Sequence, residues 1–176
     1  MSILKIARMG HPVLRTVARR VEPSEVKSPA LQKLIDDMIE TMEEYHGIGL
    51  AAPQVHESVR LVLLGIEDGR DGEDAALRVI PVINPEITPV GSEVAEDWEG
   101  CLSVPDLRGR VPRPVEVRLR GLDRKGGRLD LNLRDFPARV AQHEVDHLDG
   151  ILFVHRMRSL DTLTFLEEFG KYWQKD

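Results

Sequence analysis

The sequence predicts an α+β fold, and two observations lead to this class. Apolar residues recur with helical spacing in stretches that lie far apart in the chain, whereas strictly alternating stretches lie next to each other. Strands and helices are not interleaved as repeated strand-helix-strand units, which would indicate a doubly wound parallel sheet. We therefore expect antiparallel pairing, with helices packed against the sheets.

The first predicted helix runs from about residue 29 to residue 46. Ser28-Pro29 is a start signal for a helix, and Gly47 is a stop signal. We expect the helix to bury one apolar face against a sheet. That face consists of residues at three- and four-residue steps: Leu31, Leu34, Ile35, Met38, Ile39, Met42 and Tyr45.

Two apolar runs of strand length follow this helix. Residues 60–66 form the first run, and residues 79–83 form the second. Because proline cannot donate a backbone hydrogen bond, Pro81 limits the second run to an edge or bulged strand. The intervening residues 67–76 are acidic and contain glycine, so we expect a surface loop there.

A hairpin is predicted further along the chain. Residues 115–120 and 129–134 alternate strictly between apolar and polar side chains, and residues 123–127 supply a turn. This alternation predicts one face on the core and one face in water.

Two helices are predicted in the C-terminal part. Pro137 begins a helix that Gly150 ends. A short terminal helix is expected after Ser159, from the spacing of Leu160, Leu163, Leu166 and Phe169.

Composition limits the kinds of protein that this chain can be. Its 176 residues suit a single domain, residues 1–176. A formal net charge of -6 provides no basic field for nucleic acid or an anionic membrane. No apolar run approaches the roughly 20 residues that cross a bilayer. A lone cysteine, Cys101, excludes an intrachain disulfide and fits a reducing compartment, so we expect the cytoplasm. The basic residues 1–21 lack the serine-rich character of a transit peptide, and we assign them to the domain.

Residues 143–147 read His-Glu-Val-Asp-His and carry the strongest chemical signal. Residues four apart lie on one face of a helix, so His143 and His147 can bind one divalent metal ion. Glu144 between them is suited to carry a proton. A catalytic site of this kind typically has three protein ligands and one open position.

The sequence leaves the third ligand open. A metzincin protease would need a histidine at position 153, where this chain has Phe153. A thermolysin-like protease would use a later glutamate, and Glu167 or Glu168 has a plausible separation. The competing candidate is Cys101 within Glu-Gly-Cys-Leu-Ser, because a thiolate is a strong soft donor. Taken alone, however, a lone cysteine is more often a small buried apolar residue.

A third segment, Gly47-Ile48-Gly49-Leu50-Ala51-Ala52-Pro53-Gln54, consists largely of small residues. Its backbone can approach a ligand closely, and Gln54 can project its amide N–H into a cleft. A non-catalytic metal-binding module is a further alternative. Structural zinc sites normally have four protein ligands, however, and a fourth is not evident here.

Taken together, these segments resemble the peptide deformylase family. GIGLAAPQ at 47–54, EGCLS at 99–103 and QHEVDHLDG at 142–150 are similar to its three signature motifs, in the same order. The flanking MGHPVLR, INPEI and VPRP segments are also similar, so the likeness covers most of the chain.

The resemblance implies a set of roles at a metal site. Cys101, His143 and His147 would be the metal ligands, and Glu144 the general acid and base. Glu99 would orient a metal-binding histidine. One divalent ion per chain is implied, Fe(II) first, although this donor set also suits Zn(II), Ni(II) or Co(II). The implied fold has antiparallel or mixed sheets around a central metal-binding helix, with an N-terminal and a C-terminal helix.

The resemblance also implies the substrate contacts. Gln54 and the backbone N–H of Leu102 would form an oxyanion hole. Gly47, Ile48 and Gly49 would line a groove where the substrate pairs like an added strand. Arg108 would contribute to substrate binding. The residues expected to contact the substrate are therefore Gly47, Ile48, Gly49, Gln54, Leu102 and Arg108.

The implied activity is hydrolytic removal of the formyl group from N-formylmethionyl peptides, with release of formate. We expect a monomer with no membrane partner and no direct nucleic-acid readout. The ribosome near the nascent-chain exit is a candidate partner. The main rival is a zinc endopeptidase, which would cut internal bonds instead.

Overall fold

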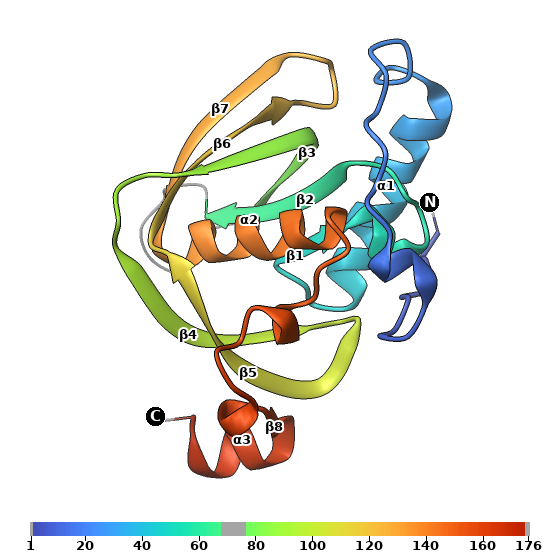
Figure 1. The fold of residues 1–176 in the computed structure, drawn as a ribbon. Helices are drawn as coiled ribbons and strands as arrows, with labels where there is room; N and C mark the ends of the chain where they lie inside the picture. The colour runs from blue at the N-terminus through green and yellow to red at the C-terminus, as the bar shows by residue number, and fades with distance from the viewer. Residues whose placement is uncertain (1, 68–76, 175–176) are drawn as a thin grey trace.

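The computed structural model describes residues 2–67 and 77–174, in which two antiparallel sheets surround a central helix (Figure 1). The larger sheet has the order β1-β2-β3-β6-β7, and the smaller sheet has the order β4-β5-β8. The larger sheet consists of β1 (Gly49–Ala51), β2 (Leu61–Glu67), β3 (Leu77–Pro89), β6 (Glu116–Leu122) and β7 (Arg128–Arg134). The smaller sheet consists of β4 (Val94–Cys101), β5 (Val104–Pro114) and β8 (Thr164–Phe165).

The described residues form α-helices α1 (Pro29–Glu44), α2 (Asp135–Leu148) and α3 (Leu166–Tyr172). Short 3-10 helices are η1 (Pro12–Arg15), η2 (Ala52–Val55), η3 (Phe153–His155) and η4 (Leu160–Thr162). The predicted α+β class is confirmed, with an N-terminal helix, a C-terminal helix and α2 lying between the two sheets (Figure 1). No helix in the described part of the chain is both long and apolar enough to span a membrane.

Helix α1 confirms the first predicted helix and ends two residues earlier than expected. The Ser28 hydroxyl accepts a hydrogen bond from the backbone N–H of Leu31 at 3.2 Å, which caps the first turn. The apolar face packs against β1 and β2 and includes Ile35 and Met38, both fully buried. At the other end, Gly47 donates its backbone N–H to the carbonyl of Met42 at 2.8 Å, so the chain turns from α1 directly toward β1.

The strand predicted at 60–66 is confirmed as β2, and the edge prediction for 79–83 holds for residues 79–82, which pair with β2 but not with β6. Strand β3 is longer and lies between β2 and β6. Proline is tolerated because the pairing of β3 with β6 begins only at Ile83, beyond Pro81. The bulge alternative is also right, since the β3–β6 register shifts between Ile83 and Glu86. Of the surface loop expected at 67–76, residues 68–76 lie outside the described residues.

Strands β6 and β7 confirm the predicted hairpin, but the smaller sheet was not predicted. Its central strand β5 has the sequence VPDLRGRVPRP, in which prolines and charged residues hide the alternation. Strand β4 is mostly polar and largely exposed except near Glu99. Pairing between these two strands brings Trp98 opposite Arg110 and ends beside Cys101.

Helix α2 begins at Asp135, two residues before Pro137, and ends before Gly150 as predicted. Ala138 and Ala141 are fully buried against the larger sheet, which lets the helix approach it closely. Gly150 has φ +71°, and a Cβ there would lie 2.8 Å from the carbonyl carbon of Arg15. The helix is buried on most of its surface, and its buried polar residues are Arg139, Gln142, His143, Glu144, Asp146 and His147.

The segment after Ser159 is helical only in its last part. Residues 160–162 form the 3-10 helix η4, and β8 then adds a third strand to β5 before α3 begins. The predicted terminal helix is therefore confirmed but shorter, because Phe165 is used in strand pairing with Leu107.

The packing of α1 generates a prediction about stability. Ile35→Ala removes a side chain that is 0% exposed and should lower the free energy of unfolding by about 2–5 kcal/mol. Ile3→Ala, at a position 52% exposed, is the matched control and should change it by about 0.5 kcal/mol or less. Equilibrium denaturation measures both values, and equal losses would contradict the assignment of Ile35 to the core.

Candidate metal centre

Three potential metal-binding side chains meet between β4 and α2. Cys101 ends β4, and His143 and His147 project from one face of α2 because they are four residues apart. One donor atom from each lies within 4.8 Å of the others. The Cys101 Sγ and the His147 Nε2 are 3.2 Å apart. Segments 42 residues apart in the chain thus supply one compact donor set.

The donor set fits a divalent transition metal. Ligands at about 2.0–2.3 Å around a tetrahedral ion are separated from each other by roughly 3.3–3.8 Å, close to the spacing seen here. Sulfur with two imidazoles suits Fe(II), Zn(II), Ni(II) or Co(II). Glu167 and Glu168, the alternative ligands, instead lie on α3 and pair with Lys171 at 2.7 and 3.2 Å.

A carboxylate fixes the orientation of one histidine. The Glu99 Oε2 and the His143 Nδ1 are 2.9 Å apart, which leaves the His143 Nε2 for the donor cluster. The Nδ1 of His147 is buried without a hydrogen-bond partner among the described residues. Burial raises the pKa of Glu99, but hydrogen bonds from His143 and Arg113 outweigh it and hold the pKa at about 2. Glu99 is therefore ionised throughout the neutral range.

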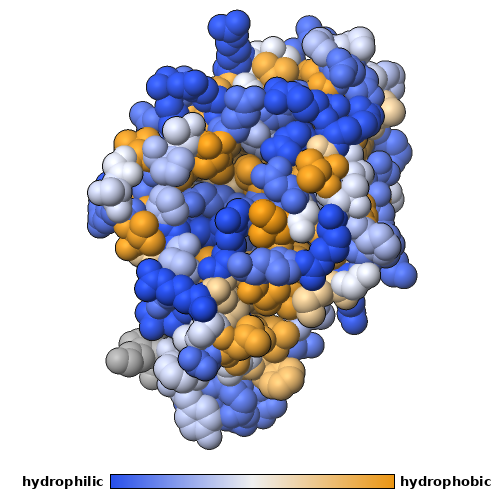
Figure 2. Space-filling model, viewed as in Figure 1, coloured by the Kyte–Doolittle hydropathy of each residue, from blue (hydrophilic) through white to orange (hydrophobic). Residues whose placement is uncertain are grey.

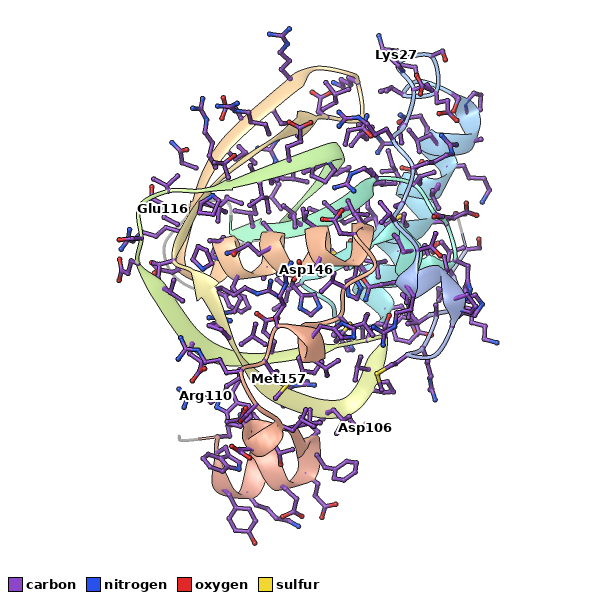
Figure 3. All side chains as sticks on the ribbon, viewed as in Figure 1. Lys27, Asp106, Arg110, Glu116, Asp146 and Met157 are labelled. Atoms are coloured by element: carbon purple, nitrogen blue, oxygen red, sulfur yellow. The ribbon has the colours of Figure 1, made fainter. Side chains whose placement is uncertain are left out.

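Arginines complete a buried ionic network around Glu99. Arg113 on β5 donates two hydrogen bonds to the Glu99 carboxylate at 2.9 and 3.0 Å, and a third to Asp146 at 2.5 Å. Arg139 on α2 reaches the same carboxylate at 2.9 Å. Asp146 also accepts two hydrogen bonds from Arg156 at 2.6 and 3.1 Å, and it lies on the face of α2 turned toward β5 (Figure 3).

The charges in the cluster favour the metal-binding form of the thiol. Burial raises the pKa of Cys101, but the imidazoles of His147 and His143 lower it well below its ordinary value. Burial lowers the pKa of His143, but hydrogen bonds to Cys101 and Glu99 raise it well above its ordinary value. Since ligands bind metal as thiolate and neutral imidazole, metal uptake should release a proton from this cluster.

Glu144 lies against the backbone of β1. A Cβ at position 49 would be 2.5 Å from the Oε1 of Glu144, so only glycine at position 49 leaves room for this carboxylate. The Oε2 atom is buried and has no hydrogen-bond partner among the described residues. Burial raises the pKa of Glu144 to about 7, although the neighbouring His143 and His147 oppose the shift. Such a carboxyl group can exchange a proton near neutral pH.

The amide of Gln54 has a fixed orientation. Its Oε1 accepts a hydrogen bond from the backbone N–H of Ala51 at 2.8 Å, so the Nε2 faces the donor cluster. The Nε2 lies 3.5 Å from the Cys101 Sγ and 3.4 Å from the Ser103 Oγ. The side chain is buried, so its N–H groups are held in a site with little water.

A cavity of about 1100 Å³ opens beside the donor cluster. Strand β1 is at an edge of the larger sheet, and it borders this cavity next to α2. Arg108 packs over Gly100 on the other side, where a Cβ at position 100 would be 2.1 Å from its Nη1. The cavity is lined by nine of the ten residues expected to bind metal, catalyse the reaction or bind substrate: Gly47, Ile48, Gly49, Gln54, Cys101, Leu102, Arg108, His143 and Glu144. His147, the tenth, is buried behind them.

The sequence reasoning missed the arginines and Asp146. One signal was available, because Arg113 lies two residues from Val111 on β5 and two residues from Val115 just beyond it, so the three share a face and the arginine is predicted to face inward. Asp146 follows His143 by three residues and thus lies near the same helix face, which was a second signal. Their partners could not be identified from spacing, since the pairs join separate elements.

Comparison with known proteins gives consistent results over most of the chain. The sequence model of a family described as polypeptide deformylase matches residues 3–162. The chain is 43% identical to peptide deformylase 1 of Nitrosomonas europaea over 159 residues, which are 90% of this chain and 89% of that relative. It is 39% identical to the peptide deformylase of Leptospira biflexa, covering 96% of this chain and 95% of the relative.

Solved structures are similar as well. A Met-Ala-Ser-bound class I type b peptide deformylase from Acinetobacter baumannii superposes with a TM-score of 0.81 at 42% identity. The match covers 89% of this chain and all of the other chain. A peptide deformylase from Synechococcus elongatus in complex with actinonin gives a TM-score of 0.78 at 35% identity, covering 89% of this chain and 79% of the other.

The buried ionic network generates a prediction about stability. Arg113→Met removes the one buried cation that pairs with both the Glu99 and Asp146 carboxylates and should lower the free energy of unfolding by about 3–5 kcal/mol. Arg118→Met breaks the exposed ion pair with Asp130 and should leave the free energy of unfolding near the wild-type value. Denaturant titration compares the two variants. Similar values for both would show that the buried network does not stabilise the fold.

Proposed function

This chain belongs to the peptide deformylase family, and we propose that Cys101, His143 and His147 are the metal ligands of its active site. Its activity is hydrolysis of the N-formyl group of newly made polypeptides, which releases formate. One observation carries the assignment of the site. A sulfur and two imidazoles from two sequence motifs meet within 4.8 Å, beside a buried carboxyl group whose pKa is about 7.

We propose one divalent ion per chain, Fe(II), held by these three residues. A bound ion of this kind makes a coordinated water molecule more acidic and polarises a carbonyl group. Three protein ligands are typical of a catalytic centre, which keeps a position open for water or substrate. The preference for Fe(II) over Zn(II), Ni(II) or Co(II) rests on the family resemblance, since the donor set suits all four.

Glu144 is proposed to transfer the proton of the reaction. Its carboxylate takes a proton from the attacking water as the new carbon–oxygen bond forms at the formyl carbon. It then donates that proton to the methionine nitrogen as the carbon–nitrogen bond breaks, which yields formate and a free amine. Contact with Gly49 and burial hold the carboxyl group in place, and its pKa of about 7 suits both transfers.

Gln54 and the backbone N–H of Leu102 are proposed to stabilise the charge on the formyl oxygen. The bond from the Ala51 N–H to the Gln54 Oε1 aims the amide N–H groups at the site before substrate binds. Leu102 lines the same cavity directly after Cys101. A pre-oriented donor of this type typically contributes about two to three orders of magnitude in rate.

The substrate backbone is proposed to pair with β1. Because β1 is an edge strand, its outer side is available for an additional strand, and Ile48 and Gly49 line the cavity at that edge. Gly47 and Arg108 are proposed to complete the binding groove. The related structure with bound Met-Ala-Ser supports a peptide as the ligand.

We infer that the enzyme acts in the cytoplasm as a monomer, with the ribosome near the nascent-chain exit as a partner. The substrate class supports this placement, because formyl groups are carried by newly made chains. We also propose that residues 1–176 form one catalytic domain, since α2 contacts strands of both sheets.

The ligand assignment predicts the metal content of two kinds of variant. Wild-type protein purified anaerobically should contain one Fe(II) per chain. Cys101→Ala should lose most of the metal, because only two of the three ligands remain. Glu167→Ala and Glu168→Ala, which remove the alternative ligands on α3, should keep it. Metal analysis by mass spectrometry distinguishes the two assignments, and unchanged metal in Cys101→Ala would favour the glutamates.

The role of Glu144 predicts a loss of turnover without a loss of metal. Glu144→Ala should reduce formate release from formyl-Met-Ala-Ser by about 10²–10⁴-fold, because the proton carrier is removed. Glu43→Ala, at an exposed carboxylate on α1, should have wild-type activity. A coupled formate assay and metal analysis are made on the same samples. An active Glu144→Ala enzyme would contradict the proposed role.

A further inference from the structure

The C-terminal segment is attached to β5 next to the substrate cavity. Strand β8 pairs with β5 through Leu107↔Phe165 and Arg108↔Thr164. The backbone N–H of Arg110 donates a hydrogen bond to the Thr162 Oγ1 at 3.2 Å. Figure 3 shows Arg110 at this junction between β5 and the C-terminal segment. The segment is therefore held in a defined position relative to β5.

Helix α3 is held against β4 by an aromatic cluster, which consists of Trp98, Phe169 and Trp173. The ring of Trp98 is 4.9 Å from that of Phe169 in an edge-to-face arrangement and 5.6 Å from that of Trp173. Such contacts add to the stabilisation from apolar burial. Trp98 is only half-buried under these rings, so part of its surface remains available.

Trp98 and Leu166 form an apolar wall at the outer part of the cavity. Both residues line it, and Leu166 is the first residue of α3. Leu166 is 42% exposed, so part of its side chain can still contact a ligand. Hydrophobic side chains also gather on the surface where β8 and α3 lie, in the lower part of Figure 2.

The distance from the metal ligands to Trp98 matches the reach of one residue of an extended peptide. Trp98 precedes Cys101 by three residues in β4, which places it roughly 10 Å from Cys101 at about 3.3 Å per residue. A peptide extended along β1, with its formyl carbon at the metal ligands, has its third residue at about the same distance.

We propose that Trp98 and Leu166 select for an apolar side chain at the third residue of the formylated peptide. This inference rests on the proposed function and adds a substrate preference to it. The family match ends at residue 162, so Leu166 and the two aromatic residues that hold α3 lie beyond it. The proposed preference thus combines Trp98, inside the family match, with a C-terminal residue outside it.

The test compares formyl-Met-Ala-Leu with formyl-Met-Ala-Ser as substrates. Wild-type enzyme should show a higher kcat/KM for the leucine peptide, mainly through a lower KM. Trp98→Ala and Leu166→Ala should each reduce the ratio of kcat/KM for the leucine peptide to kcat/KM for the serine peptide by about 3- to 10-fold. A fully enclosed apolar pocket would provide a larger ratio, because this wall is half-exposed. Tyr172→Ala, on the same helix but 72% exposed and outside the aromatic cluster, should keep the wild-type ratio.

The outcomes separate this inference from the proposed function. Ratios within twofold of wild type in both Trp98→Ala and Leu166→Ala would overturn the apolar wall, whereas activity on formyl-Met-Ala-Ser would still support the function. If the two variants lose as much kcat/KM on formyl-Met-Leu-Ser as on formyl-Met-Ala-Leu, the contact lies at the second residue, and the assignment to the third residue is overturned. No formate from either peptide with the metal-loaded wild-type enzyme would instead overturn the proposed function itself.

Discussion

The buried carboxylate of Glu99 is the interaction on which the rest of the structure depends. It joins β4 to β5 through Arg113 and to α2 through Arg139 and His143. A charge in this position is tolerated only because each oxygen is paired, since an unpartnered buried ion costs several kcal/mol. Cys101 follows Glu99 by two residues. The hydrogen bonds that stabilise the buried charge therefore also position the sulfur beside the two imidazoles. The contacts that hold β4, β5 and α2 together are therefore also the contacts that position the ligand set.

Close backbone approach is the second constraint, and it explains why small residues surround the site. Gly49 allows β1 to touch the Glu144 carboxyl group, and Ala138 and Ala141 allow α2 to lie directly on the larger sheet. This contact excludes water from Glu144 and thereby raises its pKa to about 7. A larger residue at position 49 would displace the carboxyl group rather than simply fill space. The glycine and alanine content of the motif thus has a direct chemical consequence.

The sequence predicted those elements whose signal is local. The apolar spacing of α1 and the alternation of β6 and β7 depend only on neighbouring residues, and both were found. The β4–β5 pair was not found, because its prolines and charged residues face partners elsewhere in the fold rather than following an alternating pattern. The grouping of Cys101 with His143 and His147 was expected from the family resemblance, since spacing alone left Glu167 and Glu168 as alternatives. Arg113 and Asp146 were missed because their roles depend on a contact between β5 and α2 that spacing cannot supply.

The C-terminal segment is attached to the fold in a way that leaves the chemistry independent of it. The Glu99 network joins β4, β5 and α2, and none of its members lies after residue 156. The segment from Thr162 onward is instead held by strand pairing, a hydrogen bond from the Arg110 backbone N–H to the Thr162 hydroxyl, and the rings around Trp98, all on the outer part of the smaller sheet. Sequence changes there can reshape the far end of the cavity without moving a metal ligand or Glu144. The reaction and the proposed peptide preference therefore depend on separate sets of contacts in this chain.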